Sequence, residues 1–287
     1  MINQVALISQ TENVSSSQLA LASAAIQKQV TRDVSPIWGI EATVDSFDRL
    51  SNVPLGYWQI IIRDAIPFEA QGIHLNRANG QPFALVEYSE NWALTTSHEC
   101  VEMLVDPSGN RTATANSVAP DQGRVQYLIE VCDPSESAAF GYTVNGILVS
   151  DFYTPHFFDP VASSGVRYGY TGAITKPLQV LDDGYLSWLE PVSKHVFQMF
   201  VNDGKRRIVD RGELPDGFGS LRAFSDRMTA KERKESEKTA KPTKILLTGA
   251  VSTGRESAYD RSVQAQAESL HAQIDVLLGQ NKTLKQK

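Results

Sequence analysis

The order of apolar and polar positions divides the start of the chain into strands and one helix. Residues 2–8 (INQVALI) are typical of a short strand. A helix is expected after the N-cap candidates at residues 15–17, because buried positions recur there at spacings of three and four. These positions are Leu19, Ala22, Ile26 and Val30. Ser35-Pro36 is expected to end this helix, and residues 37–44 and 56–62, both rich in Trp and Ile, are expected to form strands.

The middle of the chain combines one helix with many strands. Asn79-Gly80 predicts a turn before a strand at residues 81–88. A helix is expected at residues 96–105, where Asp106-Pro107 ends it. Residues 111–200 are rich in β-forming side chains. The two clearest features there are a strand at residues 125–131 and a hairpin at Asn145-Gly146 within residues 142–152. This order predicts an α+β fold.

Composition changes near residue 225, which divides the chain into a main domain at residues 1–224 and a tail. Residues 225–258 are dominated by charge at their start and are expected to form a linker or an exposed helix. Residues 259–287 are expected to form a helix with a coiled-coil seam or, equally, a helix that packs back onto its own domain. The seam positions are Val263, Ala267, Leu270, Ile274, Leu277, Asn281 and Leu284. A coiled coil would join the chain to itself or to a protein partner.

Charge and composition narrow the classes of function. The net charge of −6 disfavours nucleic-acid binding, which needs clustered Lys and Arg. No apolar run approaches the ~18 residues of a membrane span, and the N-terminus lacks the features of a secretory signal. A cytoplasmic protein without membrane contact is therefore expected. The two cysteines, Cys100 and Cys132, are expected to be reduced core residues.

The candidate chemistry lies at residues 95–106, TTSHECVEMLVD. At about 100° per residue, a helix gathers His98, Glu99, Glu102 and Asp106 on one side. These carboxylates repel one another unless water or a cation lies between them, and a divalent metal ion explains the cluster economically. Residues at i and i+4 project side by side, so His98 and Glu102 can hold one ion together. Glu99 would then reach a metal-bound water and act as the general base.

A third metal ligand is expected from a second acidic cluster at residues 130–136. Glu130 is the first candidate, because it interrupts an apolar run where an unpaired carboxylate is costly. Asp133 and Asp106 are the alternatives, as ligands or as acceptors that orient His98. His74 is a candidate for binding substrate or metal, or is a structural histidine. Tyr142 is a candidate for stabilising an oxyanion, or is a core tyrosine.

Each of these features also has a purely structural interpretation. Thr96-x-x-Glu99 matches a capping box, in which Glu99 would only satisfy the start of the helix. Glu102 and Asp106 would then be surface residues, and Glu130 an outward-facing residue of its strand.

The motifs S-H-E-x-x-E-M-L-x-D-P at residues 97–107 and E-V-C-D-P at residues 130–134 resemble those of a little-characterised family of bacterial and phage zincin-like proteins. Residues 72–74 and 79–84 resemble the upstream part of that family, and Phe152-x-x-Pro155 the downstream part. The resemblance does not reach the tail. It implies a zincin-type domain, in which a mixed sheet packs on the active-site helix, and a zinc site. Where better-known zincins have a second histidine, this chain has Glu102, whose extra negative charge weakens the Lewis acidity of the metal.

Two hypotheses follow from the sequence. The favoured one is a zinc-dependent, peptidase-like hydrolase that acts on a peptide or protein, with His98, Glu102 and Glu130 as ligands and Glu99 as the base. The other is a catalytically inactive adaptor or structural protein, for example in a phage-like particle, in which the carboxylates bind calcium or no metal.

Overall fold

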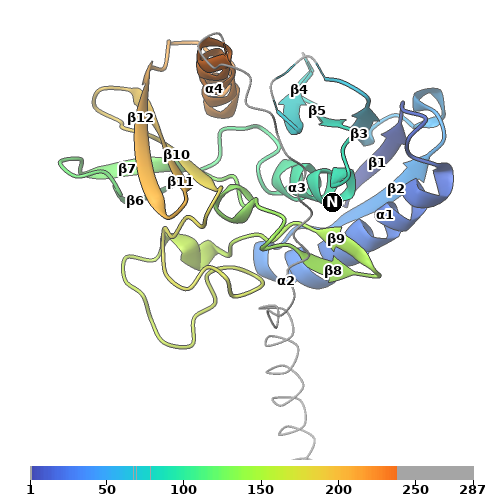
Figure 1. Ribbon diagram of the computed structural model, residues 1–287, viewed down its shortest axis with the longest axis horizontal. Helices are drawn as coiled ribbons and strands as arrows, with labels where there is room; N and C mark the ends of the chain where they lie inside the picture. The colour runs from blue at the N-terminus through green and yellow to red at the C-terminus, as the bar shows by residue number, and fades with distance from the viewer. Residues whose placement is uncertain (1, 67, 69, 78, 238–287) are drawn as a thin grey trace, which may run out of the picture. The chain divides into compact units, whose positions relative to one another are not determined.

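The computed structural model describes residues 2–66, 68, 70–77 and 79–237, and their side chains as far as residue 229. These residues belong to a compact unit that spans residues 1–241 (Figure 1). The helix and seam predicted at residues 259–287, and most of the predicted linker, lie outside the described residues. The described part is a mixed α+β structure with two five-stranded sheets and few helices, which confirms the predicted class.

The first sheet has the strand order β2-β1-β3-β5-β4. Its strands are β1 (Asn3–Ser9), β2 (Ala42–Phe47), β3 (Trp58–Arg63), β4 (Gly72–Asn76) and β5 (Pro82–Glu87). All pairs are parallel except β4 with β5, which form a hairpin around the predicted Asn79-Gly80 turn. The antiparallel strand β4 lies at an edge of this sheet and was not predicted from the sequence.

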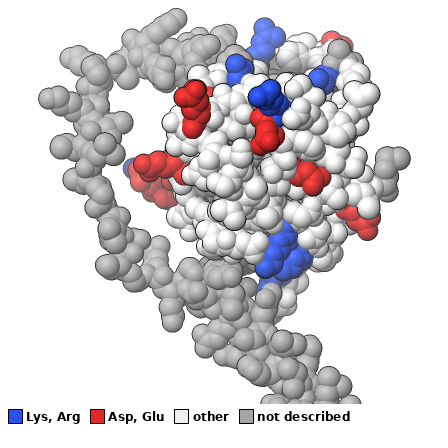
Figure 2. Space-filling view, turned by 90° about the vertical axis from the view of Figure 1, so that its right-hand side faces the viewer, with Lys and Arg blue, Asp and Glu red and all other residues white. Residues whose placement is uncertain are grey.

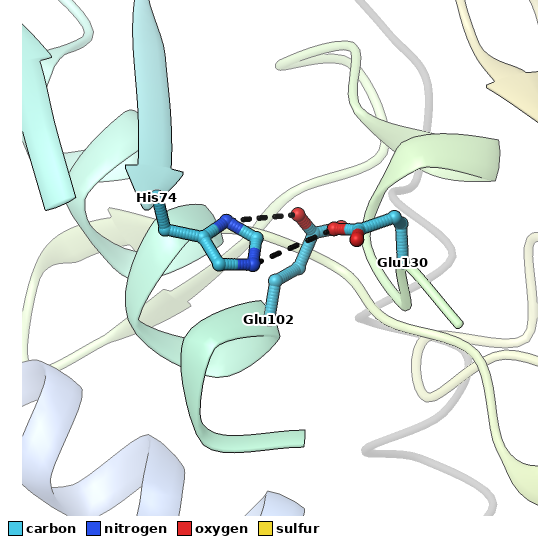
Figure 3. Close-up of side chains that lie close together, drawn as sticks. All are labelled: His74, Glu102 and Glu130. Carbon is cyan, nitrogen blue, oxygen red and sulfur yellow. Dashed lines mark ion pairs between the residues drawn. The ribbon is translucent and has the colours of Figure 1, made fainter. Parts of the chain in front are cut away.

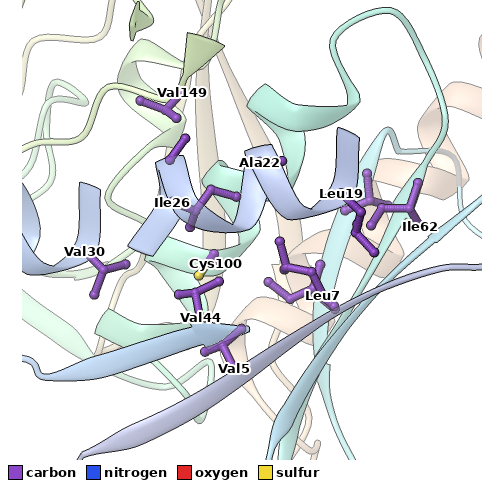
Figure 4. Close-up of a cluster of buried hydrophobic side chains, with 14 of the residues drawn as sticks. Val5, Leu7, Leu19, Ala22, Ile26, Val30, Val44, Ile62, Cys100 and Val149 are labelled. Atoms are coloured by element: carbon purple, nitrogen blue, oxygen red, sulfur yellow. The ribbon is translucent and has the colours of Figure 1, made fainter. Parts of the chain in front are cut away.

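Helix α1 (Ser16–Lys28) covers the first sheet. Ser15 caps it, in a reciprocal capping box with Gln18. Its predicted apolar face is buried in one core together with sheet residues such as Val5, Leu7 and Ile62 (Figure 4). The helical backbone continues past Ser35-Pro36 as η1 (Gln29–Val34) and α2 (Ser35–Trp38). The predicted break there is wrong, because the first turn of a helix tolerates a proline that lacks an N–H group. Consequently the strand expected at residues 37–44 begins only at Ala42.

The central helix α3 (Trp92–Val105) begins one turn earlier than predicted. Thr96 therefore lies inside the helix, where its hydroxyl donates to the carbonyl of Trp92 (2.7 Å), and the capping-box interpretation of Glu99 is wrong. Two cores enclose α3. Cys100 and Met103 pack with the first sheet, whereas Val101 packs with the aromatic core of the second half. Polar side chains of α3, including Glu99 and Glu102, are therefore buried inside the domain and do not lie on its surface.

The second sheet is antiparallel, with the order β12-β11-β10-β7-β6. Its strands are β6 (Thr112–Asn116), β7 (Arg124–Leu128), β10 (Tyr185–Leu189), β11 (His195–Asn202) and β12 (Lys205–Glu213). Glu130 was predicted to lie inside a strand at residues 125–131. Strand β7 ends at Leu128, so Glu130 instead follows the strand. The short hairpin β8 (Tyr142–Val144) and β9 (Ile147–Val149) turns at Asn145-Gly146 as expected. The described residues also include the 3₁₀ helices η2 (Leu50–Asn52), η3 (Asp133–Ser135) and η4 (Pro155–Phe158).

Helix α4 (Leu221–Glu237) crosses the domain boundary predicted at residue 225. Leu221 and Phe224 bury its first turn against Leu128 and Val196 of the second sheet. The compact domain therefore includes the start of the segment that was predicted to be a linker.

The described helices include none that is long and apolar enough to cross a membrane. Acidic and basic side chains are scattered over the face shown in Figure 2, most of which is uncharged. That face carries no continuous basic area of the kind that binds nucleic acids.

Candidate metal centre

The imidazole of His98 faces two carboxylates. Its Nε2 lies 3.3 Å from Oε2 of Glu102, one helical turn along α3, and 3.3 Å from Oδ1 of Asp133 in η3. The helical spacing therefore brings His98 and Glu102 together as predicted, and the chain after β7 adds Asp133. All three side chains are largely buried, with side-chain exposures of 14%, 3% and 3%.

A second group of possible ligands shares Glu102 with the first. His74 on β4 places its Nδ1 3.9 Å from Oε2 of Glu102 and its Nε2 3.7 Å from Oε2 of Glu130 (Figure 3). In each group, one ligand atom from every residue lies within 4.8 Å of the others, so either group could hold a metal ion of unknown identity. Glu102 is thus the central carboxylate of the cluster.

Hydrogen bonds fix how Glu102 and Glu99 point. Oε1 of Glu102 accepts from the backbone N–H of Cys132 (2.9 Å), which leaves Oε2 for the two histidines. Oε2 of Glu99 lies 2.9 Å from Nδ1 of His74. Gly72 packs directly against the carboxylate of Glu99, and a Cβ atom at that position would overlap it. Glycine is therefore needed there for the close approach of β4 and α3.

Arg222, from the first turn of α4, determines which nitrogen of His74 carries the proton. Its Nη1 contacts Nε2 of His74 and lies 3.4 Å from Oε1 of Glu130 and 3.3 Å from the carbonyl of Asp106. A guanidinium group can only donate, so Nε2 of His74 accepts. The proton of a neutral His74 is then on Nδ1, where it is donated to Glu99. Burial and the charge of Arg222 both lower the pKa of His74, which keeps the ring neutral.

The protonation of the cluster reflects a shortage of positive charge. Burial raises the pKa of Glu130 and of Asp133, and the charge of Glu102 raises both further. Burial raises the pKa of Glu99 to about 8 against the opposing charge of His98. Burial also acts to raise the pKa of Glu102, but several neighbours, led by the charge and the hydrogen bond of His98, outweigh it and the pKa is lowered. Burial acts to lower the pKa of His98, yet Glu102, Cys132 and Asp133 together raise it well above 6.5. Without a metal ion, protons therefore balance the carboxylates.

Two cavities adjoin these residues and share lining residues such as His98 and Glu99. The inner one, of about 40 Å³, is lined by both ligand groups and by Arg222, Ser225 and Asp226 of α4. The outer one, of about 1360 Å³, reaches His98 and Glu99 from outside and is open to solvent. Tyr185 on β10 lines both cavities. Among the described residues, the candidate site thus adjoins a large cavity along one side.

Two of the predicted site residues lie elsewhere. The carboxylate of Asp106 does not orient His98, because it accepts hydrogen bonds from Ser108, Asn110 and Arg111 just after α3. The helix ends at Val105, and Asp106 therefore turns away from the helical stripe. Tyr142 is a core residue whose hydroxyl donates to Asp33 (2.8 Å), and it lines neither cavity. Its assignment as the oxyanion-stabilising phenol is wrong.

Three residues of the site were not predicted from the sequence: Tyr185, Arg222 and Asp226. Each lies far along the chain from α3, in a segment without a recognisable motif. Burial and the charge of Asp133 raise the pKa of Tyr185, so its hydroxyl remains a hydrogen-bond donor near the cluster. The sequence gives no local sign that Arg222 and Asp226 face the cluster, because that depends on where the fold places α4.

Comparisons of the chain with protein-family models, with curated proteins and with solved structures found no match. The functional argument therefore depends on the site itself.

Proposed function

We propose that this protein is a zinc-dependent hydrolase of the zincin type that cleaves peptide bonds. The observation that carries the proposal is the convergence of His98, Glu102 and Asp133 on a small cavity beside Glu99. One imidazole and two carboxylates form a ligand set that suits zinc, and an open position would remain for water or substrate. Their two negative charges balance a divalent cation, which removes the cost of burying them unpaired.

His98, Glu102 and Asp133 are preferred over the second group as the zinc ligands. In the second group, both nitrogens of His74 already have partners, Glu99 and Arg222. Arg222 also places a permanent positive charge beside Glu130. His98 has no such neighbour among the described residues, since its Nε2 faces only carboxylates. Asp133 therefore replaces Glu130 as the proposed third ligand.

Glu99 is the proposed general base. A zinc ion held by the three ligands would polarise the scissile carbonyl and lower the pKa of a bound water to about 7. Glu99 lies one position from His98 and lines both cavities, so it can take the proton of that water and pass it to the leaving amine. The Nδ1–H group of His74 holds one oxygen of Glu99, which fixes the orientation of its carboxylate.

The outer cavity and strand β4 favour an extended peptide as the substrate. Residues of β4 line the cavity, and β4 pairs only with β5 in the described part of the chain. Its outer edge can therefore add the main chain of a peptide as a further strand. Aromatic residues on the opposite wall, including Tyr185, Phe200 and Phe224, offer apolar contacts for side chains of the substrate.

Hydrolysis of fluorescently labelled casein by the zinc-loaded protein tests this proposal. Glu99→Gln is expected to lower the rate at least about 100-fold, the lower range for loss of an acid–base group, while zinc remains bound. Glu41→Gln is the matched control, because Glu41 is exposed and lies far from Glu99 in the chain. It is expected to leave the rate unchanged. Equal rates for the wild type and Glu99→Gln would refute the catalytic role of Glu99.

A further inference from the structure

Helix α4 delivers a positive charge into the second ligand group. The side chain of Arg222 is only 6% exposed, and its Nη1 lies between His74 and Glu130. It therefore occupies the position at which the nitrogen of His74 and an oxygen of Glu130 would otherwise meet a metal ion. Glu102 belongs to both groups, so an ion in either one would bind to the same carboxylate.

A small cavity lies beside the two groups, and Arg222 forms part of its wall. It measures about 40 Å³, and one water needs ~10–15 Å³ by the same measure. A metal ion with bound water therefore fits beside Arg222. An ion between His74 and Glu130 would take the position of the guanidinium group, whose Nη1 lies close to both residues.

The next turn of α4 offers further ligand atoms that make no hydrogen bond among the described residues. Oδ2 of Asp226 and Oγ of Ser225 are buried, and within the described part of the chain neither makes a hydrogen bond. Both residues line the inner cavity. A buried carboxylate oxygen without a hydrogen bond is costly, and a cation in the cavity would satisfy it.

We propose that His74, Glu102, Glu130 and Asp226 form a latent second site for a divalent metal ion, which Arg222 fills in the native protein. The guanidinium group thereby limits the centre to one ion. Loss of its charge opens the site to a second zinc ion, which shares Glu102 with the first. This inference rests on the proposed function in one respect, namely that the native ion is held by His98, Glu102 and Asp133.

The number of zinc ions bound per chain tests the proposal. The full-length proteins are equilibrated with zinc, passed through a desalting column and measured by elemental analysis. Wild type is expected to bind one ion and Arg222→Met two. Adding Glu130→Gln to Arg222→Met is expected to return the value to one. Arg227→Met removes the same charge from an exposed position of the same helix and is expected to retain one ion.

The outcomes separate the two proposals. One ion in both wild type and Arg222→Met, or two ions in wild type, overturns the latent site. No ion in wild type defeats the proposed function. In that case, the latent site is still supported if Arg222→Met gains an ion and the double variant with Glu130→Gln loses it again. If Arg222→Met gains no ion, the latent site is overturned. If Arg222→Met lacks a cooperative melting transition, the neutral Arg222→Gln, which can still donate to the carbonyl of Asp106, replaces it with the same expectations.

Discussion

Nδ1 of His74 lies 2.9 Å from the carboxylate of Glu99, although 25 residues separate them in the chain. Arg222 contacts the other nitrogen of the ring, so the imidazole acts as a neutral donor with a fixed tautomer. The carboxylate proposed to act as the base is thus held by a strand, β4, and indirectly by a helix, α4, that follows the second sheet.

This relationship predicts that His74 positions Glu99 without binding the native metal. His74→Phe is expected to lower kcat about 10- to 100-fold, the range for loss of a group that orients a metal-site residue, with zinc content unchanged. His74→Asn keeps an N–H donor near the position of Nδ1 and is expected to recover part of the rate. Steady-state kinetics on labelled casein and elemental analysis check both values. An equal loss of kcat in the two variants would contradict the positioning role.

The choice of Asp133 over Glu130 as the third ligand predicts a difference in zinc affinity. Asp133→Asn is expected to weaken binding by more than the ~10- to 100-fold effect of losing a residue that only supports a ligand. Glu130→Gln is expected to weaken it less than about 10-fold, because Arg222 and not zinc is its partner. Competition with a chromogenic chelator gives both dissociation constants. The reverse order of the two variants would assign the metal to the second group.

The raised pKa values predict how pH affects the stability of the metal-free protein. As the pH rises above 6.5, the carboxyl and histidine side chains of the unfolded chain lose their protons. The folded protein retains a proton on Glu99, whose pKa is about 8, and on His98, whose pKa is raised well above 6.5. The folded state therefore binds more protons, and its stability falls as the pH rises from about 6.5 to about 8. Zinc displaces these protons and removes the fall. Thermal melts with and without zinc measure this, and the rise in Tm on adding zinc is expected to grow with pH. A rise that is constant or shrinks over this range would contradict the proton balance.

Tyr142 is predicted to affect folding and not catalysis. Its hydroxyl donates to the buried carboxylate of Asp33, which also accepts from Tyr170. Tyr142→Phe leaves that carboxylate with one donor fewer and is expected to cost about 1–3 kcal/mol of unfolding free energy. Zinc content and casein hydrolysis are expected to be unchanged. Urea denaturation measures this loss of stability. Tyr57→Phe is the control, because the hydroxyl of Tyr57 donates to Asp45 at the surface. Its free energy of unfolding is expected to lie within about 0.5 kcal/mol of wild type.

Local geometry explains which parts of this structure could be predicted from the sequence. The apolar spacing in α1, the turns at Asn79-Gly80 and Asn145-Gly146 and the pairing of His98 with Glu102 all depend on residues a few positions apart. Helical periodicity places i and i+4 side by side whatever the rest of the chain does.

The positions of side chains near the end of a helix or strand were harder to predict. Asp106 was placed on the polar stripe of the helix, but α3 ends before it and its carboxylate caps the following turn. Glu130 was preferred over Asp133 as the third ligand because it interrupts an apolar run, and each of the two residues belongs to a group that could hold a metal ion. Strand β7 ends at Leu128, and the turn η3 then directs Asp133 at His98.

The contribution of α4 could not be predicted, because it depends on a contact across 148 residues between Arg222 and His74. In the sequence, the start of this helix precedes a charged stretch that is typical of a solvated segment. Only the fold shows that Arg222, Ser225 and Asp226 of this helix line the cavity beside the metal-binding cluster.

Diffraction from zinc-soaked crystals, with data collected on both sides of the zinc absorption edge, tests the central claim most directly. The account predicts one strong anomalous peak, about 2.0–2.2 Å from Nε2 of His98 and from oxygens of Glu102 and Asp133. A map without a peak at these three residues, or with zinc bound only at the protein surface, would contradict it and favour the structural adaptor.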